Sequence, residues 1–153
     1  MYRRIGITGG SGSGKGYVCS ILREMGYPCI DTDSVVHALY VTNKDCLNEL
    51  KNEFGDAIFE NEVLVRSKLA QIVFSDPEKL NMLNTIVHRY VISECDNICK
   101  ELFEKGNETV FIDAPQLYEA GMEKMLDAVI AVIASKDLRI KRIIKRDSIS
   151  ELS

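Results

Sequence analysis

The fold is decided by one segment near the N-terminus, Ile5-Gly6-Ile7-Thr8-Gly9-Gly10-Ser11-Gly12-Ser13-Gly14-Lys15-Gly16. Its first four residues form a short apolar run that is typical of a buried strand. The glycines and the lysine that follow match the phosphate-loop pattern G-x-x-x-x-G-K, and a helical pattern comes next. This order predicts a nucleotide phosphate site, because the N–H groups of a glycine turn and of a helix N-terminus both point at bound anions.

Two other interpretations of the glycine segment are weaker. A flexible Gly-Ser turn would not need strand, lysine and helix to follow one another in this order. A dinucleotide-binding turn needs a glycine three positions after Gly12, where the sequence has Lys15. We therefore expect the ammonium of Lys15 to reach the β- and γ-phosphates of a nucleotide. The residues expected to bind the phosphates are Gly10, Ser11, Gly12, Ser13, Gly14, Lys15, Gly16 and Tyr17.

The phosphate loop departs from the usual pattern immediately after its lysine. A small hydroxyl residue there normally ligates Mg²⁺, but this sequence has Gly16 followed by Tyr17. Glycine has no ligand to offer, and the tyrosine hydroxyl is far out on its ring. We therefore expect either that water takes the ligand position or that magnesium is held weakly, so that nucleotide binding survives better than turnover.

Three further apolar runs predict strands at residues 27–31, 110–113 and 128–134. Unbroken apolar strands are typical of a sheet that is covered on both faces. Between the strand at residues 5–8 and the strand at 27–31, Val18, Ile21, Leu22 and Met25 recur at helical spacing, and Gly26 follows as a helix stop. A strand–helix–strand unit of this kind builds parallel sheets. The sequence therefore predicts an α/β, three-layer P-loop kinase fold with a central parallel sheet.

The middle of the chain, roughly residues 33–105, is predicted to be mostly helical. Asp76-Pro77 is typical of a helix start, and a long helix is expected from about His88 to Gly106. We predict one domain over 1–153, with a core of 1–32 and 107–153 and a helical substrate-binding insertion at about 33–106.

Carboxylates follow two of the predicted strands. Asp31 and Asp33 close the second strand, at the sheet edge where ligands of parallel sheets collect. Asp33 is expected to accept a proton from a substrate hydroxyl, with Asp31 in support as a magnesium ligand; a helix N-cap is the alternative for Asp33. Asp113 ends the central strand and is expected to order Mg²⁺ and to face the substrate.

Several blocks of sequence together resemble the dephospho-coenzyme A kinase family, in the family's order and over essentially the whole chain. The blocks are Ile5 to Lys15, Gly26-Tyr27-Pro28-Cys29-Ile30-Asp31-Thr32-Asp33, Val73-Phe74-Ser75-Asp76-Pro77, Leu83-Asn84 with His88, and Asp113-Ala114-Pro115-Gln116-Leu117-Tyr118-Glu119-Ala120-Gly121. The resemblance implies transfer of a phosphoryl group from ATP to the ribose 3′-hydroxyl of dephospho-CoA, with Mg²⁺. It also implies that the family continues beyond Ser153, so that a lid and a C-terminal segment would be missing here.

The resemblance assigns roles to individual residues. Lys15 and Asp33 would be catalytic, together with Arg146, which would spread transition-state charge from the lid. The substrate would contact Asp33, and His88 in the insertion would belong to the CoA-binding part, although the family's next residue, proline, is Arg89 here. The remaining substrate contacts implied by the resemblance are Asp113, Pro115, Leu117 and Glu119.

Composition limits the other classes of function. The 19 Lys and Arg against 23 Asp and Glu give a net charge of -4 and an isoelectric point of about 5.3, which argues against general nucleic-acid binding. No apolar stretch suggests a membrane span, and the five cysteines include no C-x-x-C pair, so we expect a cytoplasmic protein with reduced thiols, monomeric or weakly homo-oligomeric. Two alternatives stay open: a nucleotide-binding protein without turnover, and another small-molecule or nucleoside monophosphate kinase.

Overall fold

The computed structural model describes residues 1–10 and 12–147, and the chain divides into two compact units. Unit 1 comprises residues Met1–Asp31 and Ile98–Ser153, and unit 2 comprises Thr32–Asn97. Within the described residues, no helix has both the length and the apolar character that crossing a membrane requires.

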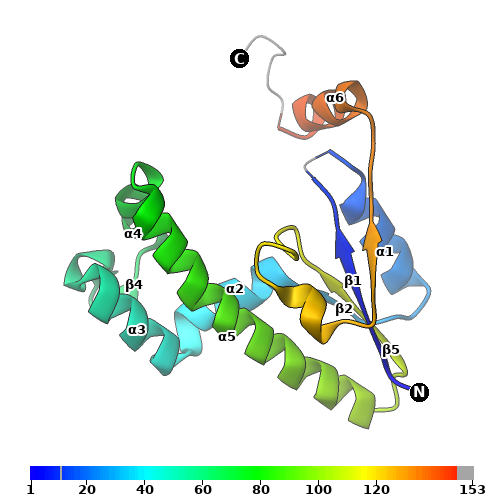
Figure 1. Cartoon of the computed structure of the whole chain (residues 1–153), viewed down its shortest axis with the longest axis horizontal. Coiled ribbons are helices and arrows are strands. Elements are labelled where there is room, and N and C mark those ends of the chain that lie inside the picture. The colour runs from blue at the N-terminus through cyan, green and yellow to red at the C-terminus, as the bar shows by residue number, and fades with distance from the viewer. Residues whose placement is uncertain (11, 148–153) are drawn as a thin grey trace. The chain divides into compact units, whose positions relative to one another are not determined.

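Unit 1 is built on a parallel sheet of four strands, shown in Figure 1. The strands are β1 (Arg3–Thr8), β2 (Cys29–Asp31), β5 (Thr109–Asp113) and β6 (Ala128–Ala131). Their order is β2-β5-β1-β6, and every pairing is parallel. The prediction of a central parallel sheet is therefore confirmed.

Helices join and flank these strands. Unit 1 contains α1 (Lys15–Glu24), the short 3₁₀ helix η2 (Met122–Met125), α6 (Lys136–Asp147) and the end of α5 (Pro77–Glu104). The predicted stop after α1 is confirmed, because Gly26 has a φ of 92°, a value that few residues other than glycine adopt.

The two faces of the sheet carry different side chains because successive strand residues point to opposite sides. Ile7 and Phe111 pack with Cys19 of α1 on one face. On the other face, a Cβ atom at Gly6 would lie 2.5 Å from side-chain atoms of Leu117 and Leu126, so glycine allows a close approach there. Residues that share the alternation of Ile7 and Phe111 therefore face α1.

Unit 2 is mainly helical, with one hairpin that the sequence did not predict. Its elements are α2 (Thr32–Thr42), α3 (Lys44–Phe54), η1 (Asp56–Ile58), β3 (Phe59–Glu60), β4 (Val63–Leu64), α4 (Arg66–Phe74) and the first part of α5. The hairpin turns through Asn61 and Glu62, with φ values of 50° and 65°. Two-residue turns of this geometry usually carry a glycine, whose absence here removed the sequence signal.

The long helix α5 corrects one prediction and confirms another. It begins at Pro77, not near His88, and runs unbroken to Glu104. The predicted start at Asp76-Pro77 is right, since the Asp76 carboxylate accepts hydrogen bonds from the backbone N–H groups of Glu78 and Lys79 at 3.2 and 3.3 Å.

Two apolar patterns in unit 1 are less buried than predicted. The strand expected over residues 128–134 ends at Ala131, and Ile130 is 41% exposed, because β6 pairs only with β1 among the described strands. On α1, Ile21 and Met25 are exposed at 36% and 65%, whereas Cys19 is fully buried. The buried side of α1 is thus rotated from the predicted stripe toward Lys15 and Cys19.

Candidate active site

The loop between β1 and α1 has the backbone of a phosphate cradle. Gly12 and Gly14 have φ values of 77° and 99°, in the left-handed region that favours glycine. The N–H of Ser13 donates to the carbonyl of Gly10 at 3.1 Å, which closes the turn. Gly9 is needed for a different reason, since a Cβ there would lie 2.6 Å from the Ser13 hydroxyl oxygen. The predicted loop residue Ser11 lies outside the described residues.

The phosphate cradle has hydrogen-bond donors that are available to the phosphate oxygens of a nucleotide. Helix α1 has no side chain capping its first turn and no acidic residue there, which leaves its N-terminal N–H groups and dipole available to an anion. Ser13 is only 4% exposed, and its buried hydroxyl has no hydrogen-bond partner among the described residues. A buried hydroxyl without a partner is costly unless a ligand oxygen satisfies it.

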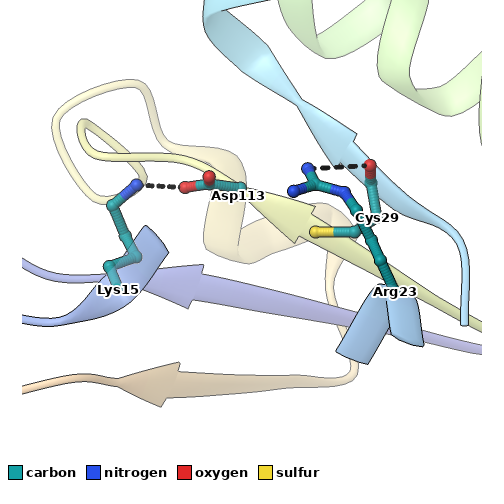
Figure 2. A network of polar contacts seen from close by, with 4 residues as sticks. All are labelled: Lys15, Arg23, Cys29 and Asp113. Carbon is teal, nitrogen blue, oxygen red and sulfur yellow. Dashed lines mark hydrogen bonds and ion pairs between the residues drawn. The ribbon is translucent and has the colours of Figure 1, made fainter. Parts of the chain in front are cut away.

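The predicted lysine and the predicted central carboxylate lie together. Figure 2 shows the ammonium of Lys15, at the start of α1, pointing at the carboxylate of Asp113, at the end of β5. The two side chains are 18% and 14% exposed, so their ion pair is weakly screened by water. Residues 98 positions apart in sequence thus bring a cation and an anion to the mouth of the phosphate loop.

A second carboxylate stands beside Asp113 in the sheet. Asp31 is the register partner of Asp113 across β2 and β5, which sets their Cα atoms about 4.8 Å apart on the same face. No group of three or more His, Cys, Asp or Glu side chains suited to a metal occurs in the described part of the chain. A pair is enough for magnesium, which usually takes one or two carboxylates together with water and substrate phosphates.

A buried thiol on α1 feels the charge of this carboxylate, and sequence reasoning missed it. Cys19 is fully buried and packs with Ile7 and Phe111, and Cys29 lies against the same cluster. Burial, followed by the charges of Cys29 and Asp113, raises the pKa of Cys19 to about 12. Burial also raises the pKa of Cys29, whose carbonyl accepts a hydrogen bond from Arg23 at 3.5 Å, as Figure 2 shows. The available signal was the four-residue spacing from Lys15, which puts Cys19 on the same face of α1.

The two residues after the lysine are open to solvent. A Cβ atom added at Gly16 would meet nothing within 4 Å, so a side chain would fit there. The Tyr17 side chain is 72% exposed. The structure therefore places both positions at the surface of the first turn of α1, next to the phosphate loop.

The predicted substrate contacts that follow Asp113 differ in their exposure to solvent. Pro115 and Glu119 are exposed, as a contact with a ligand requires. Leu117 is fully buried, with its side chain against Gly6 on the face of the sheet opposite α1. Its position is that of a core residue that fixes the segment.

The remaining predicted residues belong to helices and not to the strands of the sheet. Asp33 is exposed in the first turn of α2, one residue inside the helix, so it does not occupy the N-cap position of the alternative interpretation. His88 lies half-buried within α5. Arg146 belongs to α6, and its side chain is outside the described part of the structure.

A parallel sheet, a glycine loop ahead of α1 and a carboxylate paired with the loop lysine define a P-loop kinase, a nucleotide-dependent phosphotransferase. The family described as Dephospho-CoA kinase matches residues 3–153. The chain therefore belongs to the dephospho-CoA kinase family.

Two of the relatives reported next carry the name of this family, and the third is uncharacterized. The chain is 39% identical over 148 residues to the dephospho-CoA kinase of Fusobacterium nucleatum, covering 95% of this chain and 74% of the relative. It is 34% identical over 152 residues to that of Geobacillus kaustophilus, covering 99% and 76%. An uncharacterized protein of Caenorhabditis elegans is 36% identical over 149 residues, covering 95% of this chain and 63% of the relative. The chain thus spans between 63% and 76% of the length of these relatives.

Solved structures share the fold. A crystal structure of a Thermus thermophilus protein has a TM-score of 0.76 and 38% identity, and the match covers 97% of this chain and 74% of that one. The dephospho-CoA kinase from Campylobacter jejuni has a TM-score of 0.70 over 98% of this chain and 75% of its own, at 23% identity, which supports the fold alone.

Proposed function

We propose that this chain transfers the γ-phosphoryl group of ATP to the ribose 3′-hydroxyl of dephospho-CoA, giving coenzyme A and ADP. The observation that carries the proposal is the contact between the Lys15 ammonium and the Asp113 carboxylate at the mouth of the phosphate loop. Membership of the dephospho-CoA kinase family supports the choice of acceptor.

On the donor side, backbone N–H groups of the loop and the buried Ser13 hydroxyl bind phosphate oxygens. Lys15 leaves Asp113 and turns to the β- and γ-phosphates, whose charge exceeds that of one carboxylate. This exchange of partners neutralises the phosphate charge that would otherwise repel the incoming hydroxyl.

Magnesium completes the donor site in this proposal. Asp113 and Asp31 are the residues that would hold it, directly or through water, because they are adjacent and face α1. When bound there, the ion would supply positive charge that offsets the negative charge of the phosphates. Gly16 contributes no hydroxyl, so water would have to take the ligand position that a serine or threonine usually takes, or magnesium would be held weakly.

On the acceptor side, Asp33 accepts the proton of the ribose 3′-hydroxyl as that oxygen attacks phosphorus. Its carboxylate is exposed, so an incoming ligand can reach it. Pro115 and Glu119, which are also exposed, contact the acceptor, together with His88 from α5. Arg146 stabilises charge on the transferred phosphoryl group.

The test is a coupled assay of ADP release with ATP and three acceptors, dephospho-CoA, AMP and adenosine, each with and without Mg²⁺. We expect product with dephospho-CoA alone and only with the metal. Phosphorylation of AMP or adenosine in its place would contradict the proposal, as would bound ATP without turnover on any acceptor.

A further inference from the structure

Tyr17 presents an uncovered aromatic ring in the first turn of α1. The residue is 72% exposed, and its ring contacts no other ring and no guanidinium group within the described part of the chain. Four other tyrosines do have such a partner: Tyr2 with Phe103, Tyr27 with Phe111, Tyr40 with Arg66, and Tyr90 with Arg89. A ring that no protein group covers is available to stack on a ligand.

The ring lies on the side of α1 opposite to Lys15. Successive residues of a helix are rotated by about 100°, so two positions separate these side chains by about 200°. Figure 2 shows Lys15 pointing from α1 toward Asp113 at the end of β5. Tyr17 therefore faces away from the strand end that carries this carboxylate.

The direction of a bound nucleotide follows from the same arrangement. Lys15 reaches the β- and γ-phosphates, and Asp113, the proposed magnesium ligand, lies beside it. The γ-phosphate therefore lies toward Asp113, and the α-phosphate, with the ribose and the base, lies at the other end of the phosphate chain. That end is on the side of α1 that carries Tyr17.

The ring has both the reach and the room for such a contact. Side chains of a helix lean toward its N-terminus, so a first-turn side chain is directed toward the loop that precedes the helix. A Cβ atom at Gly16 would meet nothing within 4 Å, so the surface beside the ring is open. The nucleoside can thus approach Tyr17 without displacing a protein group.

We propose that the ring of Tyr17 stacks on the purine base of ATP and so sets the affinity of the site for a nucleoside. The inference rests on the proposed function in taking ATP as the phosphoryl donor. It differs from the sequence-based expectation that Tyr17 contacts the phosphates. Stacking requires the ring, whereas a phosphate contact would require the hydroxyl, so the two assignments predict different results.

The experiment measures, by calorimetry in Mg²⁺, the affinities of Tyr17→Ala, Tyr17→Phe and Tyr2→Ala for ATP and for inorganic tripolyphosphate. Tripolyphosphate has the phosphate chain of ATP but no base, so it separates the two parts of the nucleotide. Tyr2→Ala is the matched control, because Tyr2 is 61% exposed in unit 1 but is stacked on Phe103. Tyr17→Ala should stay folded, since alanine has the higher helix propensity.

We expect Tyr17→Ala to bind ATP about tenfold more weakly, the size of effect that a lost base–aromatic stack produces. Its affinity for tripolyphosphate should stay within about twofold of that of the unmutated chain, as should the affinity of Tyr17→Phe for ATP. Tyr2→Ala should change neither affinity. In the coupled assay, Tyr17→Ala should raise the KM for ATP with little change in kcat, because the base contact is the same before and during transfer.

Equal weakening of ATP and tripolyphosphate binding in Tyr17→Ala would overturn the inference, because the side chain would then act on the phosphates. An unchanged ATP affinity in Tyr17→Ala would also contradict it, and so would a Tyr17→Phe variant as weak as Tyr17→Ala. If the unmutated chain bound ATP but phosphorylated no acceptor, the proposed function would fail. The two sets of affinities would still decide the role of Tyr17.

Discussion

The two units of this chain differ in how their candidate residues are positioned. In unit 1, Lys15, Asp31 and Asp113 are set by a helix start and by the register of two adjacent strands, so the backbone itself brings them to one sheet edge. In unit 2, Asp33 is exposed on α2 and His88 is half-buried on α5. We propose that unit 1 carries nucleotide binding and, through Pro115 and Glu119, some contacts with the acceptor, whereas unit 2 supplies Asp33 and His88 to the acceptor.

Lys15→Ala is the strongest test of the assignment of nucleotide binding to unit 1. Loss of the ammonium should lower kcat/KM for ATP by about 10³-fold, because it removes charge stabilisation at the transferred phosphoryl group. The control is Lys51→Ala in unit 2, whose side chain is exposed and pairs with Asp56 at 3.4 Å. An activity of Lys15→Ala above a tenth of the starting value would contradict the assignment.

A second substitution, Asp33→Asn, tests the acceptor side. We expect kcat to fall about 100-fold, near the lower end of the effect of general-base residues. In a loose transition state the new bond to phosphorus is little formed, so the base has removed little of the proton. The KM for ATP should not change. Asp45→Asn is the control, since Asp45 also lies in the first turn of a unit 2 helix. Equal losses in both variants would show an effect on the helices and not on the chemistry.

The bare position after the lysine offers a gain of function. Gly16→Ser should raise magnesium-dependent turnover several-fold with a smaller change in ATP affinity, because the new side chain has room and supplies the missing hydroxyl. Gly16→Ala separates the hydroxyl from the higher helix propensity of any side chain. If alanine raised turnover as much as serine, the magnesium explanation would be wrong.

The smallest effect concerns the hairpin of unit 2. Glu62→Gly should stabilise the protein by about 0.5–1 kcal/mol, since it relieves a left-handed backbone at the cost of some unfolded-state entropy. Glu60→Gly, in β3, should destabilise it instead. Denaturant unfolding measures both, and a loss of stability in Glu62→Gly would show that the turn is not strained.

The sheet and its edge could be predicted from sequence because their signals are local. Apolar runs, the glycine loop and carboxylates directly after strands each mark a position without knowledge of the rest of the chain. The sequence did not predict the ion pair of Lys15 with Asp113, although the parallel topology brings the ends of the strands to one edge.

What could not be predicted depends on packing. The strand β6 is partly exposed because it lies at the edge of the described sheet. Its apolar composition predicts a buried strand and gives no sign of this edge position. The buried side of α1 includes Cys19 because that face meets Ile7 and Phe111, and the sequence offered the more apolar Ile21 and Met25 instead. A cysteine behaves as a small apolar residue, and its sequence position alone does not show whether it is buried.

The central claim is that the loop ending at Lys15 binds the phosphates of ATP. Titration calorimetry with ATP, ADP and AMP tests it most directly. We predict saturable binding of ATP and ADP, much weaker binding of AMP, and a large loss of ATP affinity in Lys15→Ala. No heat with either ATP or ADP, from a chain that circular dichroism shows to be folded, would contradict the account.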